Sequence, residues 1–274
     1  MSSVPVLVKP GSDTYPSGLQ DLEERPAVWV LGTLPTKAAV AVVGTRRCTR
    51  YGVDLAEGFG QVVARAGWTT VSGLARGIDA AAHRGCLRLS GAAVAVLGSG
   101  VDVCYPSENK PIYDEIVVSG GAILSEYAPG TPPDRWRFPA RNRLIAALSG
   151  AVVVVEAAAT GGALITARLA AEMGRPVFVV PGDVDRVTSE GCNRLIRDGA
   201  HPVLGPSDLL EELSLVIGPP APAIDPGHGI PAEGIRIADL PDVWSLTVTQ
   251  TLIKLGRLEL EGKVKRLGDH IVPG

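Results

Sequence analysis

The chain has 274 residues and a formal net charge of −3, and 46% of its residues are hydrophobic. This composition can fill a sizeable buried core, and it excludes a chain that is disordered throughout. No apolar run approaches the roughly 18 residues that a membrane span needs, and the N-terminus lacks the charged and apolar blocks of a signal peptide, so we expect a cytoplasmic protein.

Short apolar runs alternate with amphipathic stretches along residues 38–216. Several runs are continuous in Val, Ala and Leu, which is typical of strands covered on both faces in a parallel sheet. The predicted strands are 39–43, 69–71, 93–97, 122–124, 151–155 and 176–180, and the predicted helices are 53–66, 79–89, 110–119, 143–149 and 164–173. This order predicts an α/β fold with a doubly wound, mostly parallel sheet and right-handed crossovers. One more strand is predicted at 28–32, and we expect residues 1–37 to pack on this domain as an N-terminal segment.

The remaining residues divide into a linker and a small module. Residues 217–234 hold five prolines and four glycines with little helix or strand pattern, which is typical of a linker. Within 235–274, a predicted helix at 247–255 and strands at 264–267 and 270–272 resemble a small winged helix. Because this module has six Lys or Arg against five Asp or Glu, its charge gives little support for binding duplex DNA. It could instead recruit partners as an interaction scaffold.

One segment concentrates basic and aromatic residues. Residues 135–143 hold four arginines and two aromatic rings in a chain whose net charge is negative. Guanidinium groups hold phosphates through paired N–H donors, and aromatic faces stack on unpaired bases for roughly 1–3 kcal/mol each. The segment therefore predicts single-stranded nucleic acid as the ligand, with these contacts: Arg135, Trp136, Phe138, Arg141, Asn142 and Arg143.

The start of the predicted helix at 143–149 supports an anion at this segment. Asn142 and Arg143 are expected to open that helix, where positive side chains oppose the helix dipole, and a bound anion would relieve the conflict. An arginine-rich surface loop whose aromatic rings pack on the core would have the same composition. The segment alone does not separate these two interpretations.

Glycine turns follow three of the predicted strands. In open α/β sheets, ligands collect at the carboxyl ends of the strands, where helix N-termini direct free N–H groups at an anion. Three adjacent turns that carry arginines therefore predict a long anion-binding rim. The candidate residues are Gly44, Thr45, Arg46 and Arg47 in the first turn, Gly73, Arg76 and Gly77 in the second, and Thr160, Gly161 and Gly162 in the third. Any one such turn could also serve only to reverse the chain, because glycine permits tight turns without a ligand.

No pattern in the sequence predicts a cofactor or a metal. A fourth turn, Gly98-Ser99-Gly100, begins like a dinucleotide fingerprint, but Val103 stands where the third glycine belongs, which argues against NAD or FAD. The four cysteines lie far apart without a C-x-x-C pair, which argues against a zinc site and a disulfide framework.

Catalytic groups are sparse. Glu156, at the end of a run of valines, is the best lone candidate for a general base, and no nucleophile or second carboxylate is fixed near it. Asp79 and His83 stand four apart on a predicted helix, where the carboxylate is favoured by the helix dipole and the two side chains can simply pair. We therefore expect a binding protein and not an enzyme. The alternative is a nucleotide-processing enzyme of the phosphoribohydrolase type that uses Glu156 beside Gly161 and Gly162 on a mononucleotide.

Ordered blocks along residues 13–213 resemble the DNA-processing protein DprA (Smf) family of bacterial natural transformation. Five of these blocks are Val43-Gly-Thr-Arg46, Ser72-Gly-Leu-Ala-Arg-Gly-Ile-Asp79, Val96-Leu-Gly-Ser-Gly-Val-Asp102, Phe138-Pro-Ala-Arg-Asn-Arg143 and Gly162-Ala-Leu-Ile-Thr166. The resemblance implies an extended Rossmann-like domain that binds and protects single-stranded DNA, acts as a homodimer and helps to load the RecA recombinase. It also implies DNA contacts at Gly44, Thr45, Arg46, Phe138, Arg141, Asn142 and Arg143, with the helix start at Gly161 and Gly162 completing the pocket.

Overall fold

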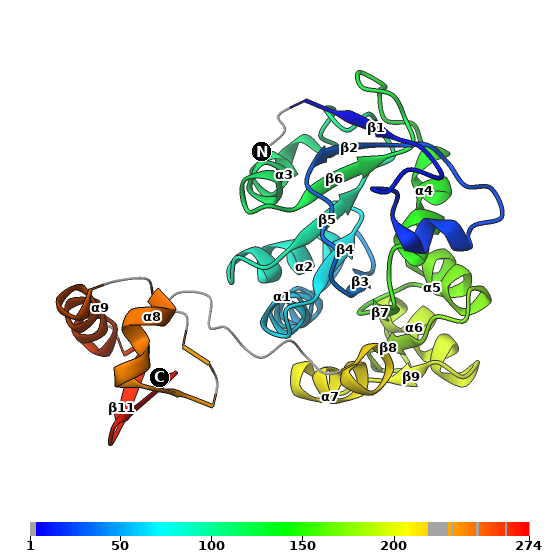
Figure 1. The fold of residues 1–274 in the computed structure, drawn as a ribbon. Coiled ribbons are helices and arrows are strands. Elements are labelled where there is room, and N and C mark those ends of the chain that lie inside the picture. Colours follow the sequence, from blue (N-terminus) through cyan, green and yellow to red (C-terminus); the bar gives the residue numbers. More distant parts are fainter. Residues whose placement is uncertain (1–3, 219–229, 232, 245–246, 261, 274) are drawn as a thin grey trace. The chain divides into compact units, whose positions relative to one another are not determined.

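The computed structural model describes residues 4–218, 230–231, 233–244, 247–260 and 262–273 (Figure 1). The chain forms two compact units, Met1–Pro219 and Pro220–Gly274. Most of the predicted linker, residues 219–229 and 232, lies outside the described residues. Among the described residues, none of the helices is both long and apolar enough to cross a membrane.

The first unit is built on a nine-stranded sheet in the order β1-β2-β6-β5-β4-β3-β7-β8-β9. The strands from β6 to β9 in that order pair in parallel, while β2 runs antiparallel to β6 and β1 antiparallel to β2. The predicted doubly wound, mostly parallel sheet is confirmed. The strands are β1 Val6–Val8, β2 Val28–Gly32, β3 Ala39–Val43, β4 Thr69–Ser72, β5 Ala93–Val96, β6 Ala122–Ser125, β7 Ala151–Val154, β8 Val177–Val179 and β9 His201–Pro202.

Two of these strands were not predicted. β1 and β9 are the outermost strands, and they have only three and two residues, too few to show a strand pattern. Because β1 and β2 extend the sheet beyond β6, the first 37 residues contribute strands to it and do not only pack against it.

Helices cover both faces of the sheet (Figure 1). They are η1 Ser17–Asp21, α1 Arg50–Arg65, α2 Ile78–Leu87, η2 Ser107–Asn109, α3 Lys110–Val118, α4 Arg137–Ala147, α5 Gly162–Glu172, α6 Val187–Arg197 and α7 Pro206–Ile217. Helices α6 and α7 were not predicted. The expected start of α4 was wrong, because the helix begins at Arg137, six residues before Arg143. Pro139 fits the first turn of α4, where a backbone N–H has no partner within the helix.

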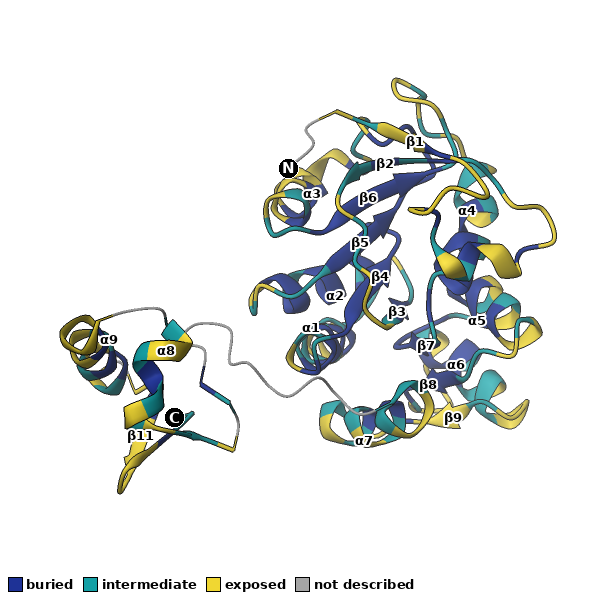
Figure 2. Cartoon of the chain, in the orientation of Figure 1, coloured by how far each residue is buried: buried dark blue, intermediate teal, exposed yellow. Residues whose placement is uncertain are grey.

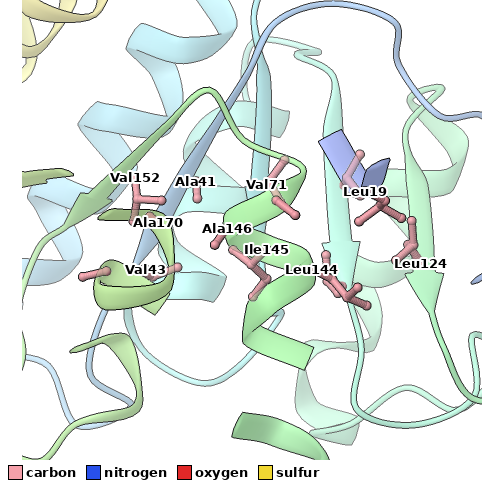
Figure 3. Packing of buried hydrophobic residues seen from close by; sticks show 14 of the residues in the cluster. Leu19, Ala41, Val43, Val71, Leu124, Leu144, Ile145, Ala146, Val152 and Ala170 are labelled. Carbon is pink, nitrogen blue, oxygen red and sulfur yellow. The ribbon is translucent and has the colours of Figure 1, made fainter. Parts of the chain in front are cut away.

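The central strands β3 to β7 are buried on both sides (Figure 2). On one face, Leu144 and Ile145 of α4 and Ala170 of α5 pack with strand residues such as Val43 and Val152 (Figure 3). The opposite face packs against α1, α2, α3 and α7. The continuous Val and Ala runs of the sequence are thus explained by helices on both faces.

The second unit contains a small antiparallel sheet in the order β10-β12-β11. Its elements are β10 Ile235–Arg236, η3 Ile237–Asp239, α8 Leu240–Trp244, α9 Val248–Leu260, β11 Val264–Leu267 and β12 His270–Pro273. Leu240, Leu255, Leu258 and Ile271 form its core. The small C-terminal module is present as expected.

Candidate functional site

A cavity of about 550 Å³ opens at the carboxyl ends of the strands. It is bordered by the turn after β3, by α4 and by the start of α5, next to the end of β7. The strand order reverses between β3 and β7, because the chain continues from β3 to one side and returns through β7 to the other. This main cavity therefore occupies the crevice in which doubly wound sheets hold ligands.

The start of α5 borders the main cavity with free backbone groups. Helix α5 begins at Gly162. The residue before it, Gly161, has no side chain that could cap the helix. The first N–H groups of a helix have no partner within the helix, and the helix dipole is positive there. An added methyl group at Gly162 would meet no atom within 4 Å, so this end of the helix is open to a ligand. The arrangement suits an anion.

Three arginines add positive charge to the same cavity. Arg46 and Arg47 lie in the turn after β3 and Arg135 precedes α4, and all three are exposed cavity-lining residues. Within the part of the chain that the structure describes, none of them has a carboxylate within 4.0 Å. Their charges are therefore available to an external anion.

Aromatic rings stand beside these charges. The ring centre of Phe138 lies 4.9 Å from the guanidinium carbon of Arg46 and 5.5 Å from the ring centre of Tyr105, whose plane is tilted by 23°. Phe138 is half-buried, whereas 45% of Tyr105 is exposed. Tyr105 is not among the predicted contacts, because no basic or glycine-rich pattern in the sequence marks it as a ligand site.

The arginine at the centre of α4 differs from the other three. Arg141 is buried and donates hydrogen bonds to the carbonyl oxygens of Gly73 and Val96. Burial lowers the pKa of Arg141 to about 10, and nearby Asp79 opposes that effect. Arg141 lines the main cavity, but its hydrogen bonds hold α4 against the ends of β4 and β5.

The turn after β4 is not a free anion site as the sequence suggested. The amide groups of Gly73 and Ala75 donate to Oδ2 of Asp79 at 3.1 and 3.4 Å. Burial raises the pKa of Asp79, and Arg141 opposes that effect. Gly77 has φ of +78°, so glycine is required for the conformation of this turn. The chain's own carboxylate therefore occupies the position that an external anion would take.

The other predicted contacts have different surroundings. Arg143 is ion-paired with Glu126, and Arg76 is ion-paired with Glu108 on the surface. Asn142 donates from Nδ2 to the carbonyl oxygen of Gly162 at 3.1 Å, which ties α4 to the start of α5. Trp136 is exposed and meets Tyr127 edge-on at 6.0 Å. Of the predicted contacts, Gly73, Arg76, Gly77, Trp136, Arg143 and Thr160 do not line the main cavity.

Glu156, the candidate general base, holds the residue that caps α1. Its carboxylate accepts hydrogen bonds from the amide of Thr49 at 2.8 Å and from the hydroxyl of Thr49 at 2.6 Å. Thr49 precedes α1, and its hydroxyl in turn accepts from the amide of Gly52. Glu156 lines a separate cavity of about 230 Å³. No cluster that could hold a metal ion occurs among the described residues.

Residues 6–214 match the family model described as DNA recombination-mediator protein A. The chain belongs to this family. It is 42% identical over 203 residues to DNA processing protein DprA of Streptococcus pneumoniae, covering 73% of this chain and 71% of that protein. It is 41% identical over 231 residues to Protein Smf of Synechocystis sp., covering 82% of this chain. The chain spans only 56% of that relative and 56% of Protein Smf of Escherichia coli.

Two solved structures of DNA processing protein A share the fold of this family member. That from Streptococcus pneumoniae has a TM-score of 0.71 at 40% identity, covering 76% of this chain and 74% of the other. That from Helicobacter pylori has a TM-score of 0.68 at 29% identity, covering 76% of this chain and 95% of the other, and is described for its single-stranded DNA binding mode. The expected family and the Rossmann-like fold are confirmed.

Proposed function

We propose that this chain binds single-stranded DNA in the main cavity and, as a recombination mediator, delivers it to a RecA-type recombinase. One observation carries the proposal: Arg46, Arg47 and Arg135, which have no carboxylate partner among the described residues, lie around one cavity with Phe138 and the open start of α5. This charge is local, because the chain as a whole carries −3. Such a local concentration of positive charge attracts phosphates.

The shape of the site favours a single strand over a duplex. The positive groups and the Phe138 ring line a concave space of about 550 Å³. An aromatic ring can stack on a base only when that base is free of its neighbours, as in single strands. Phosphates at Arg46 and at the start of α5 would leave the bases directed at the Phe138 ring.

The predicted residues fall into three groups: direct contacts, residues that position the helices, and arginines held by a carboxylate. The direct contacts are Gly44, Thr45, Arg46, Arg47, Arg135, Phe138, Gly161 and Gly162. Arg141 and Asn142 position α4 and α5, because their side chains bond to the backbone of the protein. Arg76 and Arg143 become available to DNA only when they leave their carboxylate partners.

Delivery to a recombinase, a homodimeric state and action in the cytoplasm are further parts of the proposal. The family description as a recombination mediator supports the delivery. The homodimeric state and the action in the cytoplasm are what the resemblance to this family implies. We propose binding without chemical turnover, because Glu156 lies outside the main cavity and both its oxygens are occupied by Thr49.

Gel-shift titrations with oligo-dT and with a duplex of equal length test the binding. We expect the single strand to bind more tightly, and the logarithm of its affinity to fall with the logarithm of salt concentration by about 0.7 per phosphate contacted. A slope near zero, or equal affinity for the duplex, would refute the proposal.

For delivery, we expect the protein to shorten the lag of RecA ATP hydrolysis on DNA coated with single-strand-binding protein.

A further inference from the structure

A second, smaller hollow of about 50 Å³ adjoins the main cavity. Arg46, Tyr105 and Phe138 line both spaces, while Arg76 and Pro106 line only the smaller one. A strand that leaves the main cavity on this side therefore passes Tyr105 and then Arg76. The hollow cannot enclose a base, so a base at this place would lie on the exposed ring.

Tyr105 is the accessible ring of the aromatic pair. Its ring stacks on Phe138 with centres 5.5 Å apart, yet 45% of the residue remains exposed. A base placed on Tyr105 would extend a stack that already exists. Because every base has an aromatic face, such a platform accepts any sequence.

The loop that carries Tyr105 is fixed at several points. Ser99 donates to the carbonyl oxygen of Val103 at 2.7 Å, and the hydroxyl of Tyr113 donates to that of Val101 at 2.5 Å. Just after the loop, Asn109 donates to the carbonyl oxygen of Leu74 at 2.9 Å. Stacking on a ring held in this way costs little additional ordering.

Arg76 supplies a charge that is easily released. Its Nε and Nη2 atoms donate to the two oxygens of Glu108, each at 2.7 Å. The two side chains are 60% and 52% exposed. Solvent weakens an ion pair in such a position, and a phosphate can accept the same two hydrogen bonds from Arg76 in place of Glu108.

We propose that Tyr105 and Arg76 form a second nucleotide subsite. It takes the base and the phosphate of the nucleotide that follows those in the main cavity, and Glu108 competes with that phosphate. The subsite rests on the proposed function and adds to it a path for the strand. If Tyr105 served only to cover Phe138, any apolar side chain could replace it.

Fluorescence anisotropy of labelled oligo-dT, and of an abasic backbone of equal length, tests the stacking. We expect Tyr105→Leu to weaken binding of oligo-dT by about 5- to 150-fold. The same change should leave binding of the abasic backbone unaltered, and Tyr105→Phe should bind oligo-dT like the parent. Tyr51→Leu is the matched control, because Tyr51 is 55% exposed and lines neither space.

The charge is tested separately. Arg76→Ala should lower the salt slope by about 0.7, and Glu108→Gln should raise the affinity for oligo-dT. Two results would refute the subsite, provided that Arg46→Ala still weakens binding of oligo-dT. In the first, Tyr105→Leu binds oligo-dT like the parent. In the second, Tyr105→Leu weakens binding of the abasic backbone as much as binding of oligo-dT. In that case the proposed function stands. A parent protein that does not bind oligo-dT would remove both.

Discussion

The guanidinium of Arg141 lies 3.8 Å from the carboxylate of Asp79, and both side chains are less than a tenth exposed. Asp79 also accepts hydrogen bonds from the backbone amides of Gly73 and Ala75. One carboxylate therefore connects α4 to the turn after β4. A buried charge that loses its partner is costly. This pair therefore supports the floor of the main cavity.

Asp79→Asn should destabilise the first unit. The change leaves the charge of Arg141 buried without a counter-charge, and we expect a loss of about 3 kcal/mol in the free energy of unfolding. Urea titration followed by circular dichroism measures it. Asp54→Asn, in the solvent-exposed pair with Arg50, is the control and should leave the midpoint unchanged. Equal midpoints for Asp79→Asn and the parent would contradict the supporting role of the pair.

His83 should make the protein less stable in acid. Burial lowers the pKa of His83 to about 3, from the ordinary value of 6.5, and neither ring nitrogen has a hydrogen-bond partner among the described residues. Between these two values the unfolded chain binds a proton that the folded chain does not. Stability is therefore lost as the pH falls from about 6.5 to 3, by up to about 1.4 kcal/mol per unit.

His83→Leu isolates this effect. Urea midpoints at pH 7 and pH 5 should differ less in the variant than in the parent, because the titrating ring is gone. At pH 7 the variant should fold normally, since no hydrogen bond is removed. If both proteins lose the same stability between the two pH values, His83 is not the group responsible.

Gly162→Ala should separate binding from stability. An added methyl group would meet no atom within 4 Å outside its neighbouring residues and the backbone of its own helix, but it would stand at the open start of α5. We expect unfolding to be unchanged or slightly harder, because alanine favours a helix, and DNA affinity to fall by roughly 1 kcal/mol. Gly256→Ala in α9, equally open, is the control for both measurements. Unaltered affinity in Gly162→Ala would place the phosphate elsewhere.

Arg46→Ala should weaken DNA binding by at least roughly 1 kcal/mol and lower the salt slope by about 0.7. The side chain supplies a free charge and also lies over Phe138. Arg168→Ala, an exposed arginine of α5 outside the main cavity, should bind like the parent. Anisotropy titrations at several salt concentrations compare the two. A similar loss in both variants would indicate a general effect of charge and not a site.

The sequence by itself determined the central strands of the sheet and the family. Strands β3 and β7 were readable because burial on both faces requires continuous apolar runs, as in Val152 and Val153. The start of α4 was not readable, because Arg137 and Phe138 carry no capping signal and Pro139 can begin or end a helix.

Only the tertiary structure decided which arginines are free. The sequence does not distinguish Arg46 from Arg141. In the structure Arg46 is exposed at the cavity, whereas Arg141 is buried against Asp79, which lies 62 positions earlier in the chain. Likewise Glu156 holds Thr49, the residue that caps α1, and Tyr105 of the loop after β5 contacts Phe138 of α4. Whether a charge faces solvent depends on partners distant in sequence, and local composition carries no information about them.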